Sequence, residues 1–200
     1  MTDYQLIRLL YEECATYRVY DYRNTYKPLS NVKSLKEELK RLLHIRGSVH
    51  VLQLLEFVVD NSASPRETDL AMLAWLPWRL GGYGFPIGEM NKKKHFGDAV
   101  RRCDIWFEKA KLGIEYESDE SHSGEADIAH DSARRTFLGN KGCTVITMTN
   151  GEFKDDALSH ETMRYVGKLL GRRVREPRGR SIIARKELLA FVRSPHSVFF

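Results

Sequence analysis

The sequence predicts a mixed α/β fold in which a helical N-terminal part precedes a central mixed sheet flanked by helices. Apolar residues recur at helical spacing through the first third of the 200 residues. Short runs in the middle of the chain read as strands, and the predicted order there is helix, strand, strand, helix, strand, helix. We expect three regions: a helical N-terminal region over 1–62, a core over 63–170, and a basic C-terminal segment with a helix over 171–200.

Four helices are predicted in the first third, over residues 3–17, 33–46, 48–59 and 64–76. The second has an apolar face made of Leu35, Leu39, Leu42 and Leu43. The fourth has the clearest start, because Ser64 can cap it, Pro65 suits its first position and Glu67 follows three residues after the cap.

The middle and the end of the chain alternate strands and helices. Residues 80–94 ("LGGYGFPIGEMNKKK") are rich in glycine and predict a loop or an irregular hairpin. Strands are expected at 104–107, 112–117 and 143–149. Helices are expected at 127–140, where Gly142 is placed to end the helix, and at 155–170 and 181–193.

Composition limits the class of protein. A net charge of +5 permits an acidic partner such as nucleic acid. Three cysteines, far apart and odd in number, argue against a disulfide framework and a zinc ribbon and for a reducing, cytoplasmic setting. No apolar run approaches the roughly 18 residues that a membrane helix needs, so no membrane association is expected.

Negative charge is concentrated in one segment of this basic chain. Residues 115–131 hold seven carboxylates and two histidines but no lysine or arginine. A metal ion and a mobile acidic loop are the two explanations that we consider.

The predicted strands bring some of these carboxylates together. Side chains alternate along a strand, so Glu115 and Glu117 project from one face and Tyr116 from the other. Asp104 on the adjacent strand completes a group of three carboxylates, and His122 follows a few residues later. Such a group suits Mg²⁺ or Mn²⁺ and, with an activated water, phosphodiester hydrolysis.

These residues resemble the PD-(D/E)XK restriction-endonuclease-like superfamily, and within it the branch related to the Vsr very-short-patch-repair endonuclease. That branch has an aspartate, about ten residues, E-x-D-G, a histidine, then D-x-x-R, a leucine and G-x-x-V. The matching residues here are Asp104, Glu115, Glu117 in the aspartate's place, His122, Asp131, Arg134, Leu138, Gly142 and Val145. The helix beginning "SPRETDL" resembles the one that contributes a further glutamate, which would be Glu67.

The resemblance covers about residues 63–153 and implies an endonuclease-like core that cleaves DNA with Mg²⁺ or Mn²⁺, in repair, phage defence or a toxin system. In this interpretation Asp104, Glu115 and Glu117 bind the metal, while Glu67 and His122 support catalysis. The sequence departs from the pattern at Glu117, which replaces both the superfamily's lysine and the branch's aspartate, and at Ser118, which replaces the glycine.

Each candidate also has a structural interpretation. Glu67 can be the partner of Ser64 in a capping box. Asp104 can be a solvated acid at a strand edge, and Glu117 a surface carboxylate. His122 can act as a general base, since its ordinary pKa lies near 6.5, or be an exposed loop residue.

Basic residues flank the acidic segment and are candidates for phosphate contacts. They are Lys92, Lys93, Lys94, Arg101, Arg102, Arg134, Arg135, Arg172 and Arg173, with Arg175, Arg178, Arg180 and Arg185 further along. The alternatives are a solvated basic face, an anionic protein partner and, for Arg134, an ion pair with Asp131 three residues earlier.

Three functional hypotheses remain. The first is a DNA endonuclease, of a class that often acts as a homodimer. The second is a catalytically inactive nuclease-fold protein that binds DNA or a protein partner as a regulator. In the third, the acidic loop docks a basic protein and the metal is incidental.

Overall fold

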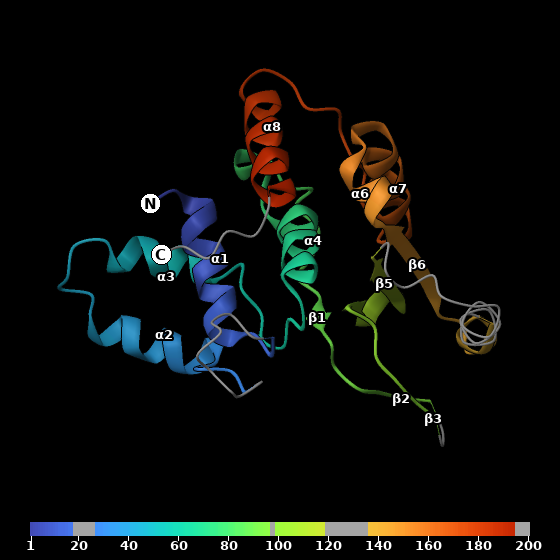
Figure 1. Ribbon diagram of the computed structural model, residues 1–200, viewed down its shortest axis with the longest axis horizontal. Helices are drawn as coiled ribbons and strands as arrows, with labels where there is room; N and C mark the ends of the chain where they lie inside the picture. Colours follow the sequence, from blue (N-terminus) through green and yellow to red (C-terminus); the bar gives the residue numbers. More distant parts are fainter. Residues whose placement is uncertain (18–26, 97–98, 119–135, 195–200) are drawn as a thin grey trace. The chain divides into compact units, whose positions relative to one another are not determined.

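The chain folds into two compact units. The computed structural model describes residues 1–17, 27–96, 99–118 and 136–194 (Figure 1). The first unit comprises Met1–Gly84 and Arg178–Phe200, and the second comprises Phe85–Pro177. The chain therefore leaves the first unit at residue 84 and returns to it at residue 178. These boundaries differ from the divisions at 62/63 and 170/171 expected from the sequence, because the helix after Ser64 belongs to the first unit.

The first unit is helical. Its elements are α1 (Asp3–Cys14), α2 (Val32–Arg41), α3 (Ser48–Leu55), α4 (Pro65–Trp75), the 3₁₀ turn η1 (Trp78–Leu80) and α8 (Arg180–Arg193). Every residue of α4 from Glu67 to Trp75 is buried, and α8 packs against both α4 and η1. The predicted start of α4 is confirmed, because the Ser64 hydroxyl accepts a hydrogen bond from the Glu67 N–H at 3.1 Å and Pro65 is the first helical residue.

A buried ion pair connects α1 to α4. The Arg8 guanidinium donates to one Asp69 carboxylate oxygen at 2.6 Å, and Arg66 donates to the other at 3.1 Å. The Asp69 side chain is fully buried, and the Phe191 ring of α8 covers Arg8 at 4.0 Å from its centroid. The buried Asp69 charge is thus compensated inside the unit.

The glycine-rich turn after η1 packs against α8. Arg185 of α8 donates to the carbonyl oxygens of Gly81 and Gly82, and its guanidinium lies 3.8 Å from the Tyr83 ring centroid. Gly81 has a φ of +75°, and a Cβ there would lie 2.2 Å from the Ala184 carbonyl oxygen. Arg185 is 8% exposed, so its assignment to a phosphate-contacting surface was wrong: it is a buried packing residue.

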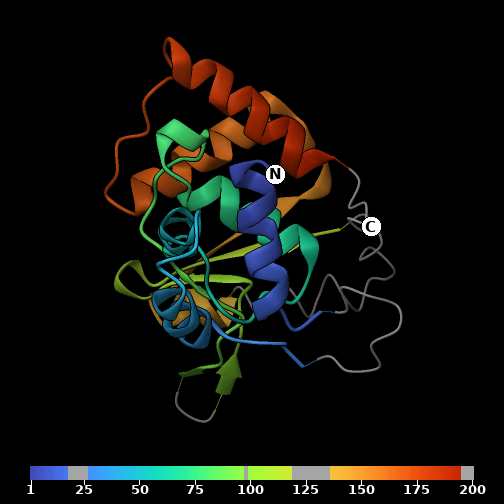
Figure 2. The same ribbon diagram turned by 90° about the vertical axis from the view of Figure 1, so that its left-hand side faces the viewer.

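The second unit contains a four-stranded mixed sheet, which confirms the predicted α/β class. Its strands are β1 (Glu89–Met90), β4 (Ile105–Phe107), β5 (Leu112–Glu117) and β6 (Thr144–Thr149), in the order β1-β4-β5-β6. β4 is antiparallel to both β1 and β5, whereas β6 runs parallel to β5. The strands β2 (Lys94–Phe96) and β3 (Ala99–Arg101) form a separate hairpin that projects from this sheet (Figure 2).

Two helices cover one face of this sheet. α6 (Asn150–Lys154) begins directly after β6, α7 (Asp156–Leu169) follows it, and both pack against β6. The short α6 was not foreseen as a separate helix, although Thr149 and Glu152 form a capping box at its start. Of the predicted helix over 127–140, only residues 136–140 are described, and they are helical. Among the described residues, no helix has the length and apolar character needed to cross a membrane.

Candidate functional site

The three candidate carboxylates lie on or directly beside neighbouring strands of the sheet. Asp104 directly precedes β4, which pairs Ile105 with Ile114 of β5, and extending that register by one residue makes Glu115 the partner of Asp104. Residues directly opposite each other in an antiparallel pair share a face, and Glu117 joins them because it lies two residues beyond Glu115. We call the side of the sheet that bears Asp104, Glu115 and Glu117 the carboxylate face. All three side chains are half-buried.

A main-chain hydrogen bond fixes the orientation of Asp104. Its Oδ2 accepts from the Tyr116 N–H at 2.7 Å, so the carboxylate takes the place of a main-chain acceptor beside β5. The Asp104 carbonyl accepts from the Asn91 N–H at 3.2 Å, which ties the start of β4 to the segment after β1. Asp104 therefore has a defined rotamer next to Glu115.

Tyr116 points to the opposite face, as the alternation of β5 predicts. Its hydroxyl donates to Asn150 Oδ1 at 2.7 Å, and its ring meets Phe153 edge-on with centroids 5.7 Å apart. Because both partners belong to α6, this side of β5 is fixed against a helix. The contacts of Tyr116 with α6 therefore fix the backbone between Glu115 and Glu117 from the face opposite to the two carboxylates.

The carboxylate face changes from apolar to polar along the strands. Trp106 lies opposite Gly113, which lies beside Val145 on β6. This part packs into a buried cluster that also contains Leu138 of the 136–140 helical segment. Two residues further along, Glu115 stands beside Thr147, and Glu117 beside Thr149. Polar side chains therefore gather where β5 and β6 end.

This arrangement suits the coordination habits of a small divalent cation. Mg²⁺ is usually bound by one or two carboxylates together with waters and substrate phosphates, so two facing carboxylates are a sufficient protein contribution. The donors are oxygens, and hard cations prefer them. Within the described part of the chain, no group of three or more His, Cys, Asp and Glu side chains is assembled closely enough to hold a metal ion.

Glu67 belongs to the first unit and caps its own helix. Its Oε2 accepts a hydrogen bond from the Ala63 N–H at 2.8 Å, one residue before the cap Ser64 with which a reciprocal capping box was expected. Glu67 is 8% exposed. Its structural interpretation therefore has direct geometric support.

Several predicted site residues lie outside the described part of the chain. They are His122, Asp131, Arg134 and Arg135. Their assignments as general base, ion-pair partner and phosphate contacts stay predictions.

Two of the predicted phosphate-binding lysines are held by carboxylates. Lys92 contacts Glu89 at 2.5 Å, and Lys94 contacts both Glu89 and Glu108, the latter at 2.5 Å. Partial burial opposes the charged form of Lys94, but hydrogen bonds to Glu108 and Glu89 outweigh it and raise the Lys94 pKa. The same contacts lower the pKa of Glu89 and of Glu108. The charges of Lys92 and Lys94 are therefore partly neutralised.

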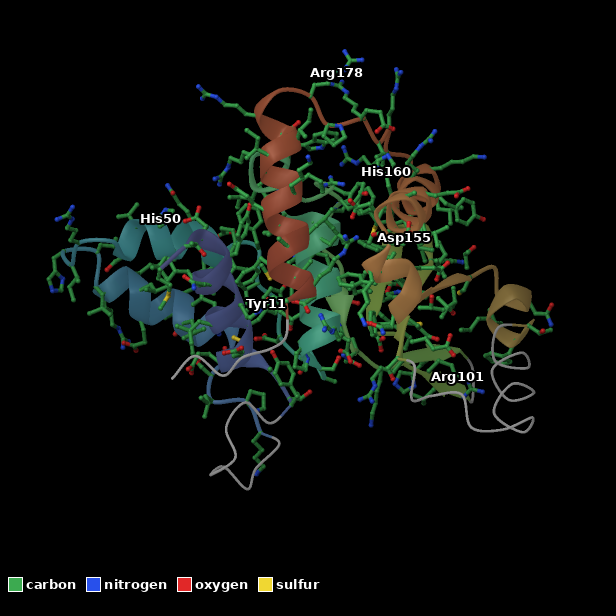
Figure 3. The ribbon with its side chains drawn as sticks, turned by 45° about the horizontal axis from the view of Figure 1, so that its top comes forward. Tyr11, His50, Arg101, Asp155, His160 and Arg178 are labelled. Carbon is green, nitrogen blue, oxygen red and sulfur yellow. The ribbon has the colours of Figure 1, made fainter. Side chains whose placement is uncertain are left out.

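Arg101 is placed differently. Its side chain is labelled in Figure 3. Its guanidinium carbon lies 5.1 Å from the Phe137 ring centroid, and the Lys141 ammonium lies 5.9 Å from the same centroid. Lys141 was not among the residues singled out from the sequence. Lys93, Arg102, Arg172 and Arg173 are exposed, as a phosphate-contacting role requires.

The sequence interpretation missed the groups that orient the carboxylates. No local pattern predicts that the Tyr116 N–H binds Asp104, since the bond depends on the pairing of β4 with β5. Thr147 beside Glu115 depends on the parallel pairing of β5 with β6. The Thr149–Glu152 capping box was a readable signal that placed α6 directly behind the site.

Comparisons with known proteins give distant and partial similarities. The chain is 28% identical over 102 residues to the uncharacterized proteins MT2308 and Rv2248 of two Mycobacterium tuberculosis strains, CDC 1551 / Oshkosh and H37Rv. The aligned part is 50% of this chain and 35% of each relative, so it spans about a third of their length. No protein-family model matches the chain, and no solved structure matches it.

Proposed function

We propose that this protein is a divalent-metal-dependent endonuclease that hydrolyses DNA phosphodiester bonds. The observation that supports the proposal is the hydrogen bond from the Tyr116 N–H to the Asp104 carboxylate, which brings Asp104 next to the strand that carries Glu115. The resemblance to the Vsr-related branch of restriction-endonuclease-like proteins includes the same two residues. Repair, phage defence and toxin systems are the settings that this resemblance suggests.

The described residues divide the work of such a site. Asp104 and Glu115 would hold Mg²⁺ or Mn²⁺, and Glu117, one side-chain period further along β5, would contribute through a metal-bound water. The bound metal would supply Lewis-acid stabilisation of the phosphate and a water of lowered pKa. Thr147 lies beside Glu115 and would orient its carboxylate or a nearby water.

The proposal is tested by a plasmid-nicking assay with Mn²⁺, Mg²⁺ or EDTA. Glu115→Gln keeps the size of the side chain and removes its charge, and it should lower the cleavage rate by about 100-fold or more. Glu161→Gln on α7 is the matched control, because Glu161 is an exposed carboxylate of the same unit. Metal-dependent cleavage that survives Glu115→Gln would refute the assignment.

A catalytically inactive nucleic-acid-binding protein is the second candidate. It is favoured by Glu117 and Ser118, which stand where the resemblance calls for a lysine or aspartate and for a glycine. A thermal shift with Mn²⁺ separates the two functions. Stabilisation that disappears in Glu115→Gln supports the endonuclease, whereas DNA binding without metal-induced stabilisation or cleavage supports the binding protein.

A further inference from the structure

Phe137 holds two cations beside the carboxylate face. The Arg101 guanidinium carbon and the Lys141 ammonium nitrogen lie 5.1 Å and 5.9 Å from its ring centroid. Both distances are within the range at which a cation is attracted to an aromatic ring. Arg101 is the last residue of β3 and Lys141 follows the 136–140 helical segment, so one ring contacts charges from two parts of the second unit.

Arg101 and Lys141 differ from Lys92 and Lys94 in their ion-pair partners. Lys92 and Lys94 contact Glu89 and Glu108, whereas none of the ion pairs formed among the described residues includes Arg101 or Lys141. Arg101 donates from Nη1 to the Val100 carbonyl at 3.0 Å, and its Nε is buried with no acceptor in the described part of the chain. A buried N–H without an acceptor costs free energy. The guanidinium's other N–H groups remain for charge-assisted hydrogen bonds to a phosphate oxygen.

The pair lies on the same side of the sheet as the candidate carboxylates. Phe137 packs against the cluster that contains Trp106, and Trp106 lies opposite Gly113. Gly113 and Glu115 are two residues apart on one strand and share a face, which corresponds to about 7 Å along β5. That distance is of the order of one to two nucleotide steps, because the phosphates of one strand rise about 3.4 Å each along a duplex axis.

We infer that Arg101 and Lys141 form a phosphate-binding subsite that holds the nucleic-acid backbone next to the scissile bond, with Phe137 as the residue that positions both cations. The position next to a scissile bond rests on the proposed function, whereas binding of the phosphate backbone requires no cleavage. Lys92 and Lys94 contribute less, because their charges are shared with Glu89 and Glu108.

Such a subsite recognises charge and not base identity. Guanidinium and ammonium groups that contact phosphate fix the register of a nucleic acid without reading its sequence. The subsite should therefore strengthen binding to all sequences equally. Its contribution should fall steeply with salt, because each contact releases condensed counterions.

The test measures binding of a fluorescein-labelled 20-base-pair duplex by anisotropy, in EDTA, over a series of salt concentrations. Arg101→Gln and Lys141→Gln should each weaken binding several-fold and reduce the slope of log K against log salt by about 0.9. Lys168→Gln on α7 is the matched control, because it removes the same single charge from an exposed lysine of the same unit. It should leave the slope unchanged. Equal slope changes in Lys168→Gln and Lys141→Gln would overturn the subsite.

The role of Phe137 is tested by a pair of substitutions. Phe137→Tyr keeps the ring and should keep the affinity. Phe137→Leu keeps an apolar side chain against the cluster and should weaken binding. A purely structural role would instead make affinity follow the melting temperature in both variants, and that result would remove Phe137 from the subsite.

The cleavage assay keeps this inference separate from the endonuclease proposal. Unchanged binding in Arg101→Gln and Lys141→Gln, together with cleavage that depends on Glu115, would refute the subsite and leave the endonuclease standing. Reduced binding and salt slope in these variants, with no cleavage under any metal, would support the subsite and refute the endonuclease.

Discussion

The two units handle charge in opposite ways. In the first unit, Asp69 is fully buried and both of its carboxylate oxygens are bound by arginines, Arg8 and Arg66. In the second unit, Asp104 and Glu115 are half-buried and share one face of a sheet with Glu117. The first arrangement is an ion pair closed within the fold, and the second places acidic residues on or directly beside two neighbouring strands.

A fully buried ion pair helps to distinguish a structural carboxylate from candidate functional ones. A buried carboxylate with two guanidinium partners is explained by the stability of the helical packing that it joins. Acids that share one face of a sheet at its polar end are candidates for binding a ligand. Burial alone would have selected Asp69 as the site residue, whereas their shared face makes Asp104 and Glu115 candidates.

The largest effect is expected from removing Asp69. Asp69→Ala leaves the buried Arg8 and the half-buried Arg66 without their carboxylate and should lower the free energy of unfolding by about 3 to 5 kcal/mol. Glu117→Gln, in the second unit, should change it by less than about 0.5 kcal/mol. Urea denaturation of both variants measures the difference. Similar losses in the two variants would mean that the acids of the second unit are structural as well.

The next largest effects are expected from replacing a glycine in each unit by alanine. Gly81→Ala combines a positive φ with a Cβ 2.2 Å from the Ala184 carbonyl oxygen and should cost about 3 kcal/mol. Gly113→Ala places its Cβ 2.7 Å from the Cys103 sulfur and should cost about 1 to 3 kcal/mol.

The loss expected from Gly113→Ala can be relieved by a second substitution. Cys103→Ala removes the obstructing side chain, so the double variant with Gly113→Ala should recover part of the loss, as measured by a double-mutant cycle in urea. No side-chain change can relieve Gly81→Ala in this way, because the obstructing atoms there belong to the backbone. Simple additivity of the Gly113 and Cys103 variants would contradict the packing described for this face.

A smaller effect is expected at the start of α7. Asp155 Oδ1 accepts from the N–H groups of Ala157 and Leu158, both at 2.9 Å (Figure 3). Asp155→Ala should lower the free energy of unfolding by about 1 kcal/mol, and Asp155→Asn, which retains a capping oxygen, by clearly less. Thermal melting compares the two variants. Equal losses would show that the carboxylate charge matters more than the cap geometry.

The smallest effect concerns pH. Hydrogen bonds from Lys92 and Lys94 lower the pKa of Glu89 below its ordinary value of 4.5. A depressed carboxyl pKa adds stability above the ordinary value, and this stability is lost as the pH falls through the folded value. The ion pairs are partly exposed, so Glu89→Gln should cost at most about 1 kcal/mol at neutral pH. This difference from the wild type should shrink below pH 4.5; a constant difference would exclude the ion pairs as its cause.

Local patterns predicted most elements, and non-local pairing explains what was missed. The start of α4 follows from Ser64 and Pro65, and the extent of β5 from its alternation, because both signals lie within a few residues. The parallel pairing of β6 with β5, the Arg8–Asp69 ion pair and the burial of Arg185 all join residues that are far apart in sequence. The candidate carboxylates were predictable because both strands are adjacent along the chain. Their hydrogen bonding was not, because it depends on the exact register.

The return of the chain to its first unit has a consequence for synthesis. Residues 85–177 are contiguous and complete the second unit as soon as they leave the ribosome. The first unit needs α8, whose Phe191 covers Arg8 and whose Arg185 binds the turn at Gly81. Until residues 180–193 emerge, the earlier helices lack this cover and their buried charges remain accessible to water. The second unit can therefore fold first, although translation begins with the first.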